Sequence, residues 1–440
     1  MKKTLLIANR GEIAVRLAAT ARDQGYAVVT VYPEDDATCA HVREGDASVL
    51  LPGIGAAAYL DAEAVIQAAV DAGATALHPG YGFLSEQSHF AEACEAAGIA
   101  FVGPTPAQLA VFGNKAGAKE IAKACNVPLV PGTEGATDLD AALAFQAQNP
   151  DLNLMVKAVH GGGGRGMRIV EAGQDLAKTF ERCASEAQMA FGSDALYVEA
   201  LLDRVRHIEV QILGDGQGSV THLWERECSV QRQNQKLLEV APCPNLLPAT
   251  RDKLLTAAKE MAASEQYRGL GTFEFLVSID SPETFYFIEA NARLQVEHTV
   301  TEAITGLDLV ALQLRIAEGA SLADLNLTEA PEPEGFAIQA RINMEVLSPK
   351  GFFKPSGGTI EHYIPPQGPG IRVDGMGYAG YTTSTRYDSL LAKLIVHSRS
   401  ADFGSAIQKL KRSLEQFDIQ GFDTNPVSYT HLTLPTICSV

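Results

Sequence analysis

Strand-like and helix-like segments alternate over residues 4–102, and this alternation restricts the fold more than any other feature of the chain. Buried strands and amphipathic helices are expected in turn at residues 4–8, 11–24, 27–32, 65–72, 75–77, 90–97 and 99–102. Strands that alternate with helices form a parallel sheet with helices on both faces. The sequence therefore predicts a doubly wound α/β unit at the N-terminus. Further along the chain, helices are expected at residues 108–125, 301–318 and 403–416, and two prolines indicate a linker at 330–334.

The length and charge of the chain limit the class of protein further. A chain of 440 residues is too long for one ordinary core, so two or three domains are expected. The net charge of -18 argues against nucleic acid as a partner, because binding phosphates needs a basic surface. The seven cysteines include no C-x-x-C pair, and no apolar run is long enough for a membrane span or a signal peptide. We therefore expect a cytoplasmic protein with neither a nucleic-acid nor a membrane partner.

A glycine-rich segment lies between two strand-like runs, and its position predicts a phosphate-binding role. Four consecutive glycines, residues 161–164, follow Lys157, and the strand-like run 167–170 comes after them. Four glycines cost backbone entropy, but they let N–H groups approach phosphates closely. A dinucleotide fingerprint needs a helix after the loop, and a P-loop needs Gly-Lys-Ser/Thr. The pattern favours a flap over phosphates, and a flexible surface hairpin is the alternative.

Residues 285–298 carry the most informative polar pattern. Polar residues occupy every second position, at Glu289, Asn291, Arg293, Gln295 and Glu297. Alternate residues of an extended strand share one face. A solvent-facing strand would show the same alternation, but it more often carries lysine, threonine or serine. We therefore predict that these five side chains lie on one face of a strand that lines a functional site.

An isolated carboxylate upstream extends this site. Glu274 lies between aromatic residues in the strand-like run 271–276, so it needs a compensating cation. Together with Glu289 and Asn291 it suits Mg²⁺, which prefers oxygen ligands. The guanidinium of Arg293 could then bind a small anion.

A third polar segment covers residues 225–236. It has no long apolar run, which predicts a loop or the mouth of a site. Arg232 and Lys236 are candidate anion ligands in this segment. Cys228 has no histidine near it in the sequence, which favours a structural role over a nucleophilic one.

Together these motifs resemble the biotin carboxylase family of ATP-grasp enzymes, from residue 3 to about residue 425. The resemblance rests on the order and spacing of the segments 7–14, 78–86, 157–167, 231–236, 271–276, 287–298 and 341–343. It implies an α/β and α+β fold of three domains. These would be a doubly wound pre-ATP-grasp domain, an ATP-grasp domain with a glycine-rich lid, and a C-terminal biotin carboxylase domain. The expected ranges are 1–112, 113–330 with the lid at about 130–203, and 335–425. Residues 426–440 contain no charged residue, and we interpret them as an atypical tail, an artefact of a junction.

The resemblance also implies roles for individual residues. The ATP-binding residues would be Lys115, Lys157, Gly163, Gly164, Glu199, Leu202, His207, Gln231 and Asn234. The ligands of Mg²⁺ or Mn²⁺ would be Glu274, Glu289 and Asn291. The bicarbonate pocket would be formed by Lys236, Arg293, Gln295 and Val296. Glu297 would be the general base, and Arg341 would hold biotin. The residues given catalytic roles are Lys236, Arg293, Glu297 and Arg341.

The activity implied by the resemblance is carboxylation of biotin with ATP and bicarbonate, the first half-reaction of a biotin-dependent carboxylase. The expected partners are a biotin carboxyl carrier protein or domain, a carboxyltransferase and a second copy of the chain. The final acceptor could be an acyl-CoA, pyruvate or urea, and an acyl-CoA, as in fatty acid biosynthesis, is the first choice. Another ATP-grasp ligase and an inactive nucleotide-binding scaffold are the competing interpretations.

Overall fold

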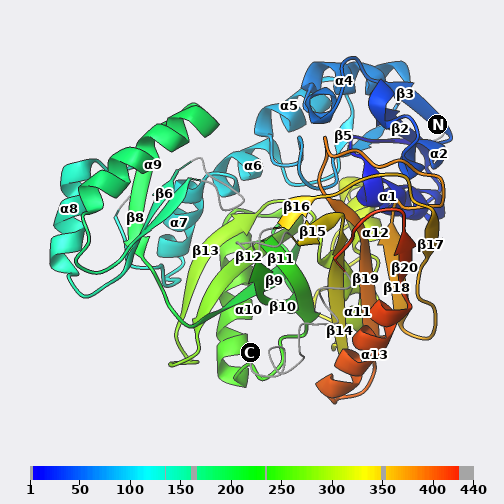
Figure 1. Ribbon diagram of the computed structural model, residues 1–440. Coiled ribbons are helices and arrows are strands. Elements are labelled where there is room, and N and C mark those ends of the chain that lie inside the picture. The colour runs from blue at the N-terminus through cyan, green and yellow to red at the C-terminus, as the bar shows by residue number, and fades with distance from the viewer. Residues whose placement is uncertain (1–2, 134, 160–165, 233–234, 348–352, 426–440) are drawn as a thin grey trace.

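The computed structural model describes residues 3–133, 135–159, 166–232, 235–347 and 353–425. Its N-terminal unit, blue in Figure 1, contains a five-stranded parallel sheet. The strand order is β3-β2-β1-β4-β5, with β1 Thr4–Ile7, β2 Ala27–Tyr32, β3 Ala47–Leu50, β4 Ala76–His78 and β5 Ala100–Phe101. The predicted parallel sheet is confirmed. The edge strand β3 was not predicted, because it is mostly exposed and lacks a buried apolar run.

Helices cover both faces of this sheet. They are α1 Gly11–Asp23, α2 Ala40–Arg43, α3 Ala56–Tyr59, α4 Ala62–Asp71 and α5 Ser88–Ala96, with a short 3₁₀ helix η1 at Glu34–Asp36. Successive residues of a strand face opposite sides. Accordingly, Leu5 and Ile7 pack with Leu17 of α1, whereas Leu6 packs with Phe90 of α5 in a different apolar cluster. The doubly wound arrangement follows from this division of the apolar side chains.

The predicted helix at residues 108–125 is two helices in the structure. They are α6 Pro106–Phe112 and α7 Lys115–Ala124. The side chain of Asn114 accepts a hydrogen bond from the Ala116 N–H and so begins α7. Because of this cap, Lys115 lies in the first turn of a helix.

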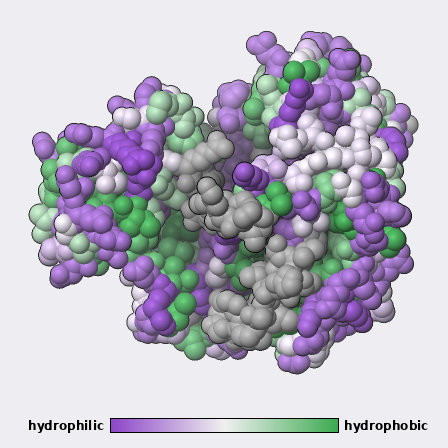
Figure 2. All heavy atoms as spheres, viewed as in Figure 1, coloured by the Kyte–Doolittle hydropathy of each residue, from purple (hydrophilic) through white to green (hydrophobic). Residues whose placement is uncertain are grey.

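The segment after α7 forms a separate lobe, the lid (Figures 1 and 2). Its elements are α8 Leu139–Gln148, β6 Leu154–Ala158, β7 Met167–Val170, α9 Leu176–Phe191 and β8 Leu196–Ala200. The three strands form an antiparallel sheet in the order β7-β6-β8. Strands on both sides of the glycine-rich segment were predicted, and both are present. Residues 160–165 themselves, with Gly163 and Gly164, lie outside the described residues.

The largest sheet has eight antiparallel strands and joins the centre of the chain to its C-terminal part. The order is β13-β12-β9-β10-β11-β14-β19-β18. The strands are β9 Val205–Asp215, β10 Val220–Arg232, β11 Gln235–Ala241, β12 Arg268–Ser278, β13 Phe285–Asn291, β14 Phe336–Asn343, β18 Ile371–Gly375 and β19 Leu390–Ser398. Pairing of β11 with β14 continues the sheet across the predicted linker. Side chains of the central and C-terminal segments can therefore meet on one sheet.

Two predictions about local structure were wrong. The segment 225–232 is part of strand β10 rather than a loop, because its charged residues are buried and paired in the interior. Strand β13 ends at Asn291, and Glu297 is the residue before the first turn of helix α11 His298–Thr305. Arg293, Gln295 and Glu297 therefore lie on a connecting segment and not along one face of a strand.

The remaining elements complete the packing around the large sheet. They are α10 Pro248–Ser264, α12 Leu309–Ala317, α13 Phe403–Gln416, β15 Glu345–Leu347, β16 Phe353–Pro355, β17 His362–Ile364 and β20 Asp418–Gln420. The helix predicted at residues 403–416 is confirmed by α13. The helix predicted at 301–318 is divided into α11 and α12 at Gly306, whose φ of +71° suits glycine. Over the part of the chain that is described, no helix combines the length and apolar character needed to cross a membrane.

Candidate active site

A row of charged residues crosses four neighbouring strands of the large sheet. The strand register places Glu274 of β12 opposite both Glu289 of β13 and Glu209 of β9. Glu209 in turn lies opposite Arg226 of β10. Neighbouring carboxylates on a sheet repel each other, so this row needs cations to be stable.

Lys236 and Arg226 supply most of the positive charge in this row. The Nζ of Lys236 lies 2.6 Å from Glu209 Oε2, 3.2 Å from Glu274 Oε1 and 2.6 Å from Glu297 Oε1. The guanidinium of Arg226 is fully buried and donates to Glu209. Burial lowers the pKa of Lys236, but the three carboxylates outweigh it and raise that pKa well above its usual range. Lys236 is therefore a permanent cation in the middle of the cluster.

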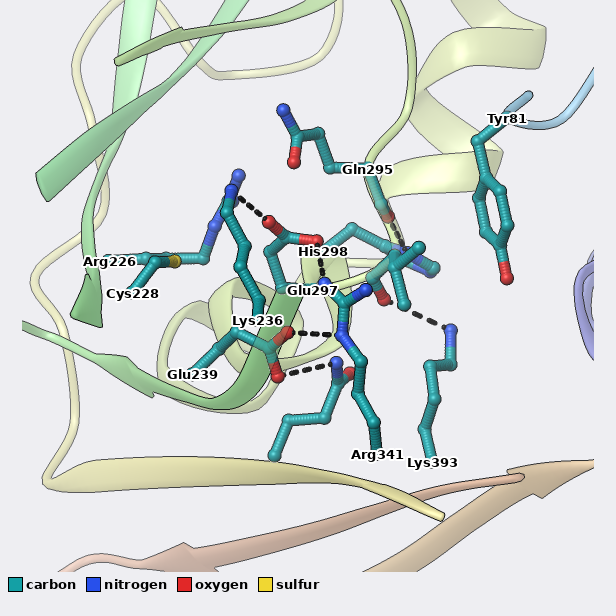
Figure 3. A network of polar contacts seen from close by, with 12 residues as sticks. Tyr81, Arg226, Cys228, Lys236, Glu239, Gln295, Glu297, His298, Arg341 and Lys393 are labelled. Atoms are coloured by element: carbon teal, nitrogen blue, oxygen red, sulfur yellow. Dashed lines mark hydrogen bonds and ion pairs between the residues drawn. The ribbon is translucent and has the colours of Figure 1, made fainter. Parts of the chain in front are cut away.

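Glu297 is held from two directions at the start of α11 (Figure 3). One carboxylate oxygen accepts from Lys236, and the other accepts from Arg341 Nη2 at 3.1 Å. Burial would raise the pKa of Glu297, but Lys236 and Arg341 hold it well below its usual range. Glu297 is thus ionised and 1% exposed, and its two oxygens are oriented by separate strands.

Arg341 is itself oriented by a buried carboxylate. Its Nε donates to Glu239 Oε1 on the neighbouring strand β11, at 2.5 Å. The other oxygen of Glu239 accepts from Gln339 at 3.0 Å. Figure 3 shows the Arg341 guanidinium between the carboxylates of Glu239 and Glu297. A planar guanidinium held in this way presents a fixed donor to a small polar group.

The three predicted metal ligands lie together. Glu274 and Glu289 are opposite each other across β12 and β13, and Asn291 Nδ2 lies 2.8 Å from Glu274 Oε1. Burial and the charge of Glu274 raise the pKa of Glu289, and Lys115 partly offsets this, with its Nζ 3.8 Å from Glu289 Oε2. Two carboxylates and an amide oxygen are a suitable donor set for Mg²⁺ or Mn²⁺, and such an ion would relieve their repulsion. The residues present fit this cation.

The other residues predicted for the anion pocket lie on the segment that follows β13. Arg293 Nε donates to Glu86 Oε2 at 2.8 Å, and its Nη2 donates to Asn291 Oδ1 at 3.0 Å. Gln295 Nε2 donates to Glu274 Oε1 at 3.2 Å. Although these side chains are not on a strand, the structure brings them to the same cluster as Lys236. Val296 follows Gln295 directly, and its backbone carbonyl accepts a hydrogen bond from Lys393.

One face of the lid carries the predicted nucleotide residues. Lys157 of β6 and Glu199 of β8 share a face, and Lys157 Nζ contacts Glu199 Oε1. Lys119 of α7 binds the other oxygen of Glu199 at 3.2 Å and lies over the ring of Tyr197. Beside them is a cavity of about 270 Å³, lined by Lys115, Lys119, Tyr197 and backbone of residues 129–133, among others. Its volume and its lysines are compatible with binding a polyanion.

Two further predicted residues lie beside the carboxylate row. His207 Nε2 contacts Glu274 Oε2, and Gln231 Nε2 lies 3.0 Å from His207 Nδ1. Burial lowers the pKa of His207, but Glu274 outweighs burial and raises it. Leu202 follows strand β8 and is partly buried. Asn234 lies outside the described residues.

Sequence reasoning missed several members of the cluster. These are Glu209, Arg226 and Glu239 of the large sheet and Lys119 of α7, which contacts Glu199 of the lid. The alternation of His207, Glu209 and Gln211 in β9 is a signal of the same kind as the one at 289–297, and it could have identified Glu209. Glu239 and Lys119 have no such signal, because their roles depend on strand pairing and on how the lid sits over α7.

A three-stranded lid beside an antiparallel sheet that carries carboxylates and cations is the arrangement of ATP-grasp enzymes. Family models agree with this class and refine it. "Biotin carboxylase, N-terminal domain" matches residues 1–109, "Carbamoyl-phosphate synthase L chain, ATP binding domain" matches 114–325, and "Biotin carboxylase C-terminal domain" matches 339–434.

Individual proteins show the same relationship. The biotin carboxylase of a Nostoc species is 44% identical over 96% of this chain and 92% of its own length. A pyruvate carboxylase of Aspergillus terreus is 44% identical over 98% of this chain, which spans only 36% of that protein. The biotin carboxylase domain dimer of Hydrogenobacter thermophilus 2-oxoglutarate carboxylase, solved with MgADP and bicarbonate, is 40% identical. Its TM-score is 0.90, over 96% of this chain and 92% of that one. The chain belongs to the biotin carboxylase family of ATP-grasp enzymes.

Proposed function

We propose that this chain catalyses the ATP-dependent carboxylation of biotin with bicarbonate, by way of carboxyphosphate, with release of ADP and phosphate. The observation that carries the proposal is the meeting of Glu297, Lys236 and Arg341, from three separate elements, within hydrogen-bonding distance. Glu297 supplies a base, Lys236 supplies a cation that can bind a small anion, and Arg341 supplies a fixed hydrogen-bond donor for a polar acceptor.

The nucleotide would lie between the lid and the carboxylate row. Lys115 and Lys157 would contact its phosphates, with Glu199, Leu202 and His207 nearer its base and sugar. Glu274, Glu289 and Asn291 would hold Mg²⁺ or Mn²⁺, which supplies charge neutralisation for the phosphates when bound. The domain boundaries predicted above are part of the same proposal.

Glu297 would act on bicarbonate as a general base. Its carboxylate takes the bicarbonate proton while the bicarbonate oxygen attacks the γ-phosphorus, and the bond to ADP breaks. A base whose ion pairs lower its pKa is ionised but weak. A bicarbonate anion that shares Lys236 and Arg293 would loosen those ion pairs and strengthen the base as the reaction begins.

Arg341 would act in the second step. Carboxyphosphate breaks down to CO₂ and phosphate, and the phosphate takes the proton from biotin N1. The negative charge that develops on the ureido oxygen is stabilised by the guanidinium of Arg341. The new bond then forms between biotin N1 and CO₂.

The partners implied by this reaction are a biotin carboxyl carrier protein or domain and a carboxyltransferase. We also propose a homodimer, as in the structure of the Hydrogenobacter domain dimer. An acyl-CoA acceptor, with a role in fatty acid biosynthesis, stays a prediction. The relatives above are named for pyruvate and 2-oxoglutarate, so the choice of acceptor belongs to the carboxyltransferase.

The test is ADP release from the purified chain with Mg²⁺, measured with and without bicarbonate and with and without free biotin. Release that needs bicarbonate and rises with biotin is the expected result. Release that needs bicarbonate but ignores biotin would indicate a different bicarbonate-activating ATP-grasp enzyme. A folded chain without turnover would favour the nucleotide-binding scaffold.

A further inference from the structure

Two successive backbone carbonyls of the turn before Glu297 contact side chains on the side of the turn that lies away from the Glu297 carboxylate. The carbonyl of Gln295 contacts His298 Nδ1 at 2.7 Å. The carbonyl of Val296 accepts from Lys393 Nζ at 3.2 Å. A trans peptide is planar, so binding the Val296 carbonyl also sets the direction of the Glu297 N–H. The backbone that carries Glu297 is thus held on the side away from its carboxylate (Figure 3).

Lys393 reaches this turn from the C-terminal part of the chain. It lies on β19, opposite Arg341 of β14, and its side chain is 0% exposed. Its ammonium also lies 3.1 Å from Glu12 Oε2 at the start of α1 and 4.0 Å from Asp374 Oδ2 on β18. Lys393 therefore joins the N-terminal unit, the C-terminal strands and the Glu297 turn at one point.

The charges around Lys393 indicate a role beyond stability. Burying an ion pair costs desolvation energy, and an apolar pair in its place is often as stable. Glu12 is 3% exposed and is bound on its other oxygen by the hydroxyl of Tyr81. From this group of buried charges, Lys393 reaches the cluster of Glu297 and Lys236 through its contact with the Val296 carbonyl. Carboxylates hold the Lys393 ammonium on one side. On the other side the same ammonium donates a hydrogen bond to the turn before Glu297.

We propose that Lys393 is a positioning residue for the bicarbonate step, which it serves by fixing the Val296–Glu297 peptide. This inference rests on the proposed function of Glu297 as the base. Among the described residues, Lys393 contacts neither the carboxylate of Glu297 nor the residues proposed for the nucleotide, so its effect is on geometry. Small displacements of a reacting group can cost about 10²-fold in rate.

The test compares E12Q/K393M with E12Q and the wild-type chain. The double variant removes both charges together, so it leaves no unpaired Glu12, while E12Q alone keeps the contact from Lys393 to Val296. The expected result is a fall of ~10- to 10²-fold in bicarbonate-dependent ADP release in the double variant, with E12Q close to wild type. The KM for ATP should change little in either variant.

Hydrogen exchange supplies a readout that does not depend on activity. Exchange should speed up at residues 292–298 in E12Q/K393M, and it should be unchanged in strands β9 and β12. Unchanged exchange in that turn, or turnover equal to that of E12Q, would overturn the inference. Should the double variant not fold, E12Q/K393Q, which keeps a polar group in the same space, replaces it with the same readouts. Absence of bicarbonate-dependent turnover in the wild-type chain would instead count against the proposed function, and the exchange measurement would still decide the role of Lys393.

Discussion

The charged cluster of the large sheet and the charged face of the lid both pair basic residues with glutamates. The two regions differ in how deeply these side chains are buried and in how many carboxylates each lysine contacts. In the sheet, Glu209 and Arg226 are 0% exposed, and Lys236 contacts three carboxylates. At the lid, the side chains of Lys157 on β6 and of Lys119 on the neighbouring helix α7 are 21% and 20% exposed and share the single carboxylate Glu199.

This difference in burial and pairing distinguishes a preorganised site in the sheet from an adaptable site at the lid. Charges in the sheet are oriented before any ligand arrives, which suits the placing of a small anion and a base. Lys119 lines a cavity, and Lys157 shares its partner Glu199. Both lysines can exchange Glu199 for phosphates at low cost, because they are partly hydrated. Substitutions in the sheet should therefore affect the chemical step, and those in the lid should affect affinity for the nucleotide.

The largest effect is expected for Glu297→Gln. The amide keeps the shape of the side chain but cannot accept the proton, so bicarbonate-dependent ADP release should fall by ~10²- to 10⁴-fold. Glu283→Gln, an exposed position in the turn between β12 and β13, is the control and should keep wild-type turnover. Near-normal turnover of Glu297→Gln would show that Glu297 is not the general base.

Arg341→Lys is expected to separate the two half-steps. Lysine keeps the positive charge beside Glu239 but loses the planar fork that fixes the donor. Biotin carboxylation should fall by ~10²- to 10³-fold, the usual cost of one lost donor at a developing oxyanion. Bicarbonate-dependent ADP release without biotin should fall much less. Equal losses in both assays would contradict the role given to Arg341.

A smaller effect on a different quantity is expected for Lys157→Gln in the lid. Loss of a hydrogen bond from a charged donor costs about 1.5–3 kcal/mol, or roughly 10- to 100-fold in affinity for ATP. The melting temperature should hardly change, because Lys157 is partly exposed. Lys178→Gln, an exposed position on the outer helix α9, should leave ATP affinity unaltered. A fall in the rate at saturating ATP, without a change in affinity, would mean that Lys157 acts on the chemical step. The proposed difference between the lid and the sheet would then be wrong.

The smallest effect concerns pH and His207, which contacts Glu274 in the sheet cluster. Burial opposes protonation, but Glu274 outweighs it and raises the pKa of His207 above the ordinary value of about 6.5. Protonated His207 therefore contributes stability that is fully present below about pH 6.5 and is lost as pH rises through the folded pKa. The difference in melting temperature between wild type and His207→Gln should be larger at about pH 6 than at about pH 9. A difference that is the same at both pH values would mean that His207 stays neutral.

Much of the fold could be predicted from local patterns, and the exceptions share a cause. The parallel sheet at residues 4–102 and the strands around the glycine-rich segment follow from the spacing of apolar residues. Strand β10 was mistaken for a loop because its buried positions are filled by Glu225, Arg226 and Glu227, which is unusual for a strand. Their burial is possible only because partners on other elements neutralise them, on strand β9 for Arg226 and Glu227 and on helix α10 for Glu225.

The residues of the site were largely predictable, whereas their geometry was not. Glu297 was expected on a strand and instead precedes a helix, yet it still meets Lys236 and Arg341. The alternation of polar residues identified which side chains matter. It could not show how the chain turns after Asn291, because that turn depends on distant contacts, such as the one from Lys393.

The sequence by itself determined the class of fold, the family and the chemical types of the residues at the site, since periodicity and residue identity are local properties. Only the tertiary structure decided which charges are neighbours. The row from Arg226 through Glu209 and Glu274 to Glu289 depends on the register of four strands, and the contact of Arg341 with Glu239 depends on the pairing of β11 with β14. Register is set by hydrogen bonds and packing between segments far apart in the chain, and no local pattern contains that information.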